Sequence, residues 1–221
     1  MKESPDALEN HQLIAWLLEG DVSIQYLVHR DLLVTEKPYL RDRIATEGWG
    51  AQFLSFRKKE GHWGQRFYQP KWTSTHYTLL DLKNLSMSPD NQEIRQSLAL
   101  VLQKLKGPDG GVSPFGKERK SDVCVNGMFL NYASYFGAEE DRLESIVDFL
   151  LSEHMKDGGF NCNSNWKGAK HSSMHSTISV LEGILEYEKN GYGYRLEELQ
   201  GSADKSRTFL LQQRLFRSDR T

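Results

Sequence analysis

The chain has 221 residues, and its 28 lysines and arginines against 30 aspartates and glutamates give a formal net charge of −2. This balance provides no overall field that would attract nucleic acid, so we expect no nucleic-acid partner. The polar start MKESPDALENHQ resembles no signal peptide and no apolar run nears the roughly 18 residues of a spanning helix, so we expect no membrane span and a cytoplasmic location.

The N-terminal part contains two helix-like stretches, IAWLLEGDVSIQYLVHRDLL and EGWGAQFLSFRK. Their apolar pattern is less regular than the pattern of the segments that follow. We therefore expect residues 1–60 to form an irregular first unit.

Three later segments have apolar residues at helical spacing. These residues are Ile94, Leu98, Val101, Leu102 and Leu105 in the first segment, Leu143, Ile146, Val147, Leu150 and Leu151 in the second, and Ile178, Leu181, Ile184 and Leu185 in the third. No stretch alternates as a strand would, and no Asn-Gly hairpin signal separates strand-like runs. The sequence predicts an all-α fold.

A turn sequence recurs before an apolar helix: KKEGHWG, KGPDGGV and MKDGGFN. The residue after each acidic-Gly-x triplet is Trp63, Val112 or Phe160, at spacings of 49 and 48. A near-constant period of this length predicts helix-pair repeats of about 49 residues. We expect one domain, residues 1–221, with repeats at about 61–109, 110–157 and 158–216.

These features together resemble the terpenoid cyclase and protein prenyltransferase superfamily over roughly residues 50–190. RKKEGHWG is similar to its Gln-Trp-type repeat motif, with Arg57 in place of Gln, and GPDGGV and MKDGGFN are similar to the Gly-Gly repeat of prenyltransferase β subunits. The resemblance implies an α/α toroid, whose two layers of helices enclose a cavity for a hydrophobic, isoprenoid-type ligand. No inner helix follows SADKSRTFLLQQRLFRSDRT, so we expect an incomplete ring.

The same resemblance implies a zinc site at Asp122, Cys124 and His175. Prenyltransferases bind zinc with an Asp-x-Cys at one inner-helix start and a histidine at the next, and here Cys124 and His175 are 51 residues apart. Carboxylate, thiolate and imidazole are all ligands of Zn²⁺. The implied activity is zinc-dependent alkyl transfer to a thiol with diphosphate leaving, and these three residues are then both metal ligands and catalytic.

Other polar residues are candidates for the same region. His76 stands near a helix start one unit earlier and is expected to face the same cavity, as a fourth zinc ligand or a phosphate contact. His171 precedes His175 by one helical turn. Cys162 ranks below Cys124, because it lies in a polar loop with no carboxylate beside it. Since two cysteines are too few for a disulfide framework, we expect both thiols to be free.

Ligand binding is expected from two further sets of side chains. Lys117, Arg119 and Lys120 precede Asp122 and are suited to hold a diphosphate. An aromatic set is expected to line the apolar cavity: Trp63, Trp72, Tyr77, Phe129, Tyr132 and Trp166.

Each candidate also has a simpler interpretation. Asp122 is suited to be a helix cap, Cys124 a small buried residue and His175 a hydrogen-bonded histidine near a helix start. The basic run is typical of a solvated surface, and aromatics at helical spacing are typical of a core. The alternative functions are a non-catalytic module that binds a ligand or protein, and a helical scaffold that closes its ring with a partner subunit or a second copy.

Overall fold

A computed structural model describes residues 5–116 and 118–217. Within those ranges the fold is all-α, as predicted, and β-type pairing is limited to the isolated bridges Arg66–Gln69 and Lys106–Val112. The helices are α1 (Pro5–Leu18), α2 (Val22–Leu27), the π-helix η1 (Val28–Leu32), α3 (Pro38–Arg43), α4 (Gly48–Ser55), the 3₁₀-helix η2 (Lys71–Thr73), α5 (Thr75–Asn84), α6 (Gln92–Lys104), α7 (Val123–Tyr135), α8 (Glu140–Ser152), α9 (Ser164–Lys167), α10 (Met174–Lys189) and α11 (Leu196–Gln212). None of the described helices combines the length and apolar character needed to cross a bilayer.

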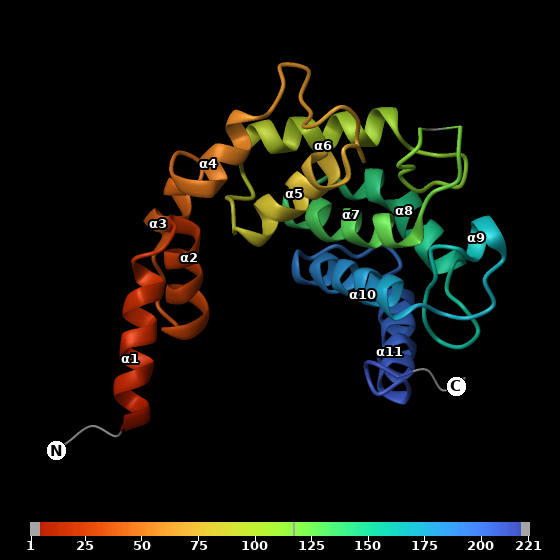
Figure 1. The fold of residues 1–221 in the computed structure, drawn as a ribbon. Helices are drawn as coiled ribbons and strands as arrows, with labels where there is room; N and C mark the ends of the chain where they lie inside the picture. Colours follow the sequence, from red (N-terminus) through yellow and green to blue (C-terminus); the bar gives the residue numbers. More distant parts are fainter. Residues whose placement is uncertain (1–4, 117, 218–221) are drawn as a thin grey trace.

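Helix α7 lies at the centre of the molecule, between α5 and α10, and packs most extensively on α10 (Figure 1). Every residue from Val125 to Ser134 is buried, so neighbouring elements cover this helix on all sides. Helix α8 packs on α7, and α11 packs on both α10 and α8. Helix α6 runs along the edge of the α5–α7 pair (Figure 1).

The predicted apolar faces are confirmed for α6 and α8, where Ile94, Leu98, Leu143 and Ile146 are buried. The face predicted for α10 is wrong in part. Ile178 and Leu185 are 45% and 44% exposed, and α10 instead buries small and polar residues together with Val180, Ile184 and Tyr187. Small residues occupy the contact with α7 because the two backbones approach closely there.

The three recurring turns share one hydrogen-bond pattern. The residue after the turn exchanges main-chain hydrogen bonds with one side chain near the start of the next long helix. The N–H donors and side-chain acceptors are Trp63 to Thr75 Oγ1 (2.9 Å), Val112 to Asn126 Oδ1 (2.7 Å) and Phe160 to Thr177 Oγ1 (3.0 Å). Each side chain also donates to the carbonyl of the same residue, at 3.1, 3.0 and 3.4 Å.

This hydrogen-bond pattern sets a spacing of 51 residues between Thr75, Asn126 and Thr177. It places His76 level with Gly127 rather than with Cys124. The expected match of His76 with Cys124 is therefore three residues out of register, because α5 begins one turn later than α7 relative to these hydrogen bonds.

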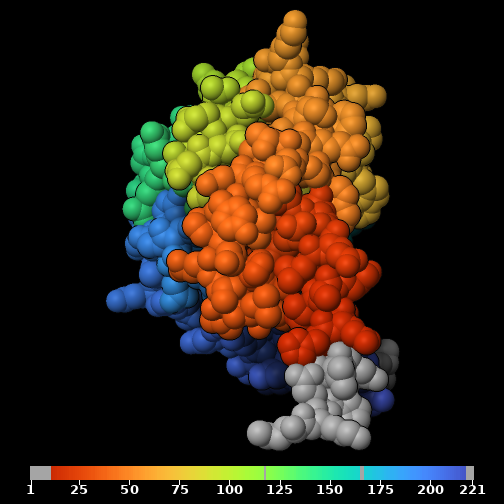
Figure 2. Space-filling view, turned by 90° about the vertical axis from the view of Figure 1, so that its left-hand side faces the viewer, coloured from red at the N-terminus to blue at the C-terminus, as the bar shows by residue number. Residues whose placement is uncertain are grey.

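The first four helices and η1 form one side of the molecule, where red and orange atoms make up most of the surface in Figure 2. Helix α2 contacts α3 and α4, and α4 contacts α5. This N-terminal part therefore packs beside the α5 end of the α5–α7–α10 row, and it contributes the walls of two of the cavities described below.

Candidate functional site

His76 is the centre of a buried aromatic cluster. Its side chain is fully buried, and its Nδ1 lies 3.1 Å from the hydroxyl of Tyr132. The rings around it have centroids 5.0 to 5.6 Å away and belong to Phe67, Tyr68, Tyr77 and Tyr132. Burial lowers the pKa of His76 to about 3, so the imidazole is neutral at neutral pH.

The second ring nitrogen of His76, Nε2, has no hydrogen-bond partner among the described residues. A buried polar atom without a partner is unusual, because leaving it unpaired costs about 1–3 kcal/mol. The histidine predicted to contact zinc or phosphate is thus held as a neutral side chain inside the protein.

The predicted aromatic set is divided between the core and the surface. Trp63, Phe129 and Tyr132 are at most 2% exposed, and the indole N–H of Trp63 donates to the carbonyl of Phe53 at 2.7 Å. Trp72 is 70% exposed and packs on Tyr77, with ring centroids 4.9 Å apart. The side chain of Trp166 lies outside the described residues. Contact of this set with a ligand stays a prediction, and its three buried members pack against protein.

Cys124 and Cys162 form a disulfide with a Cα–Cα distance of 5.8 Å, so the expectation of free thiols is wrong. The bond joins the start of α7 to the loop after the third turn. The backbone N–H of Cys124 donates to Cys162 Sγ at 3.0 Å, and the Ser176 hydroxyl on α10 donates to the same sulfur at 3.2 Å. Cys162, ranked low from the sequence, is therefore the partner that the fold brings to Cys124.

The three predicted zinc ligands lie at the starting ends of two packed helices. Asp122 is the N-cap residue of α7, although its carboxylate makes no cap hydrogen bond, and His175 is an exposed residue in the first turn of α10. Across the described part of the chain, no group of three or more His, Cys, Asp or Glu side chains is arranged to hold a metal ion. With Cys124 bonded to Cys162, this donor set does not fit zinc as it stands, because zinc takes a thiolate.

The predicted diphosphate-binding run lies in the loop before α7. Arg119 and Lys120 are exposed, and Lys117 lies outside the described residues. The fold therefore provides no enclosed position for the two described cations of this run.

An apolar groove of about 510 Å³ lies between α2, α4 and α5. Its lining consists of Ile24, Leu27, Trp49, Gln52, Phe53, Phe56, Asp81, Asn84 and Leu85. Asp81 is partly buried, and its carboxylate has no hydrogen-bond or ion-pair partner among the described residues. Burial raises the pKa of this carboxyl. No sequence pattern predicts this groove, because its lining residues come from three separate helices, α2, α4 and α5.

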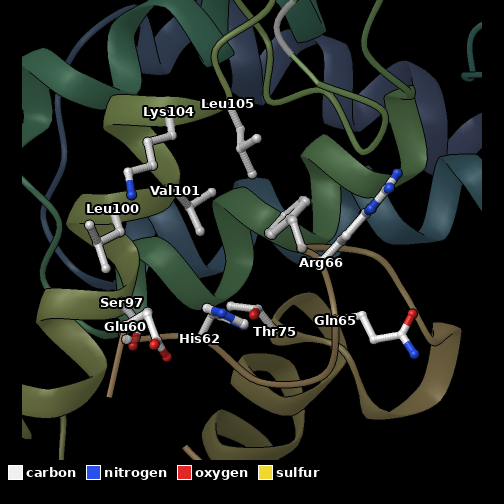
Figure 3. A pocket seen from close by; sticks show the side chains of 12 residues that line it. Glu60, His62, Gln65, Arg66, Thr75, Ser97, Leu100, Val101, Lys104 and Leu105 are labelled. Carbon is white, nitrogen blue, oxygen red and sulfur yellow. The ribbon is translucent and has the colours of Figure 1, made fainter. Parts of the chain in front are cut away.

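A smaller cavity of about 160 Å³ lies between the first turn and α6. Figure 3 shows Leu100, Val101 and Lys104 of α6 in the upper left, Glu60 drawn close to Ser97 below them, and His62 and Thr75 at the lower centre. This volume is well below the range of about 300–1,000 Å³ that is usual for small-molecule sites. The groove is thus the better candidate for a ligand with an apolar chain.

The sequence matches no protein-family model, and no curated protein is significantly similar to it. The resemblance described above therefore rests only on the turn motifs and their spacing in this sequence.

Proposed function

We propose that this protein is a helical binding module of the α/α-toroid type that takes up a hydrophobic, isoprenoid-type ligand. The toroid proposal is supported by the shared hydrogen-bond pattern of the three turns and by the order of α5, α7 and α10, which lie side by side in sequence order (Figure 1). Inner helices of such a ring follow one another in the same way.

The observation that carries the ligand proposal is the groove beside α5. Its size is within the usual range for small-molecule sites, and its lining is largely aliphatic and aromatic. Trp49 and Phe56 are 51% and 65% exposed, so they offer apolar surface that no other part of the described chain covers. Covering apolar surface stabilises a complex by roughly 25 cal/mol per Å².

The test is binding of dansyl-labelled farnesol, an uncharged isoprenoid, to the purified protein. Trp49→Ala removes a groove residue, and Trp72→Ala is the matched control because it removes another exposed tryptophan outside the groove. We expect saturable binding that weakens about tenfold or more in Trp49→Ala and is unchanged in Trp72→Ala. Absence of saturable binding to the wild type contradicts the proposal, and loss only in Trp72→Ala places the ligand at the predicted aromatic set instead.

Zinc-dependent alkyl transfer at Asp122, Cys124 and His175 is a second proposal. It is supported by the placement of these residues at the starting ends of α7 and α10, which pack on each other. A zinc held by these three residues would activate the thiol of a substrate as the nucleophile. The disulfide must first be reduced, because Cys124 binds zinc only as a thiolate. The test is the zinc content of the reduced protein and of His175→Ala, measured by elemental mass spectrometry. One zinc per chain that is lost in the variant supports this proposal, and no zinc after incubation of the reduced protein contradicts it.

A ring-closing partner, either a second copy or another chain, is the alternative that the exposed face of α10 favours. Ile178 and Leu185 on this face are nearly half exposed, although they belong to an apolar helix. Light scattering tests it, since a mass above 25.4 kDa at micromolar concentration would support association and a monomer would oppose pairing with itself.

A further inference from the structure

A second large pocket, of about 540 Å³, lies beside η1 and α3 in the N-terminal part of the molecule, away from the apolar groove. Three cations line it, Arg30, Lys37 and Arg41, together with one carboxylate, Glu36. The lining thus has an excess of positive charge, although the whole chain is slightly acidic. Charge of this sign in a concave site attracts anions.

Neutral groups contact both guanidinium groups of the pocket, and Arg30 also pairs with Asp31. Both lie near the ring of Tyr26, at 5.7 Å for Arg30 and 5.9 Å for Arg41. Ser86 accepts from both, its hydroxyl from Arg30 at 3.0 Å and its carbonyl from Arg41 at 3.3 Å. Ser86 thus contacts both of these like charges beside one aromatic ring.

Arg41 and Lys37 supply the uncompensated charge of the pocket. Arg30 pairs with Asp31 at 2.6 Å, which neutralises much of its charge. Arg41 instead donates to the hydroxyl of Tyr135 at 2.7 Å, and neither Arg41 nor Lys37 forms an ion pair within the described ranges. A partly buried guanidinium without a carboxylate is well suited to an external anion.

The backbone at the pocket has two rare features. Helix η1 is a π-helix, and Val34, which lines the pocket, has a φ of +50° and is 85% exposed. A β-branched residue pays a steric cost in this conformation, and no burial of its side chain offsets that cost. Rare backbone of both kinds is concentrated at ligand sites, where the geometry of the site requires it.

We propose that this pocket binds a phosphate group through Arg41 and Lys37, with Arg30 holding one wall. The guanidinium fork of arginine matches the oxygens of phosphate, and lysine adds a point charge. A free phosphate compound and the headgroup of an anionic phospholipid share this chemistry. The exposed side chains of Leu32 and Leu33, 57% and 37% accessible, lie next to the pocket and would contact the apolar part of a lipid.

The first experiment titrates inorganic phosphate into the protein by calorimetry. Arg41→Gln removes a pocket cation, and Arg43→Gln is its matched control on the same helix, because Arg43 is exposed, lies outside the pocket lining and pairs with Glu47. Both variants lower the net charge by the same amount. Lys37→Gln serves as a second test variant, because its side chain makes no described contact that the fold needs.

We expect saturable phosphate binding in the wild type and in Arg43→Gln. In Arg41→Gln and Lys37→Gln we expect the affinity for phosphate to fall by about tenfold or more. Equal loss in Arg41→Gln and Arg43→Gln would overturn the proposal, because it would show a general charge effect rather than a site. If Arg41→Gln fails to fold, Lys37→Gln decides the outcome.

The second experiment measures sedimentation with phosphatidylcholine vesicles that contain phosphatidic acid. Binding that requires Arg41 and Lys37 but not Arg43 identifies the lipid headgroup as the source of the phosphate. Phosphate binding without vesicle binding identifies a free phosphate compound. If the wild type binds neither inorganic phosphate nor the vesicles, the proposal is overturned.

Discussion

Gly127 of α7 and Gly183 of α10 face each other where these two helices cross. A Cβ atom on Gly127 would lie 2.7 Å from backbone atoms of Ser179 and Val180, and one on Gly183 would overlap the carbonyl oxygen of Gly127. Backbone cannot move aside as a flexible side chain can. The close packing of α7 on α10 thus depends on the absence of two side chains.

Replacing Gly127 with alanine should therefore force α7 and α10 apart. We expect Gly127→Ala to lower the free energy of unfolding by about 1–3 kcal/mol or more, as overpacking of a core does. Gly201→Ala on α11 is the control, since its Cβ would meet nothing within 4 Å and alanine favours a helix by about 1 kcal/mol. Urea unfolding midpoints measure both, and equal midpoints for the two variants would contradict the close crossing.

The disulfide between Cys124 and Cys162 should stabilise the fold by restricting the unfolded chain. The two residues are 38 positions apart, and a loop of this length corresponds to a stabilisation of about 4 kcal/mol in the chain-entropy model. We expect reduction to lower the unfolding midpoint, and Cys162→Ser to remove any further effect of reductant. Thiol titration in denaturant without reductant checks the bond itself, because two reactive thiols there would contradict it.

Asn126 should be among the most sensitive polar residues. It is fully buried, and its side chain makes hydrogen bonds to both main-chain groups of Val112 and to the carbonyl of Asp122. Asn126→Ala removes three hydrogen bonds from its side chain to main-chain groups, two of them buried, so we expect a loss of about 2–4 kcal/mol in unfolding free energy. Asn190→Ala on the exposed end of α10 is the control, and a similar small effect in both variants would contradict the role of Asn126 in holding the turn.

His76 should make stability depend on pH. Its pKa is lowered from 6.5 to about 3 in the folded state, so between these values the unfolded chain binds a proton that the folded chain does not. Stability is therefore lost as pH falls from about 6.5 toward 3, by up to about 1.4 kcal/mol per pH unit. Unfolding midpoints of the wild type and of His76→Phe across this window measure the effect, with the exposed His171→Gln as control. A wild-type slope that matches the slope of His76→Phe would contradict the buried neutral imidazole.

Local patterns in the sequence were sufficient for the helical class and for the buried faces of α6 and α8, because one-sided burial follows helical periodicity. They failed in part on α10, where Ile184 is buried as predicted but Ile178 and Leu185 are exposed. Much of the buried face of α10 consists of Gly183 and small polar residues, which carry no hydrophobic signal. Hydrophobic periodicity detects only apolar side chains, whereas a close helix crossing requires residues with small side chains or none.

The cysteine pair and the groove depend on contacts between distant segments. Nothing in the spacing of Cys124 and Cys162 indicates that the loop after the third turn folds back to the start of α7. Asp81 reads as an ordinary polar residue of a helix surface, and only the packing of α2 and α4 beside α5 makes it part of a cavity. A single sequence shows residue types and their spacing, whereas the disulfide and the groove depend on distances between segments of the folded chain.

The hydrogen bonds between turn and helix hold the helices in place independently of the length of the loops between them. The bonded residues are 12, 14 and 17 positions apart at the three turns, yet the bonds at their ends are alike. The intervening loops thus differ in length while the helices they lead to are anchored in the same way. Insertions at exposed positions of these loops, away from the buried Phe67 and the disulfide-bonded Cys162, should leave the helical framework intact, so these positions are suited to carry new binding residues.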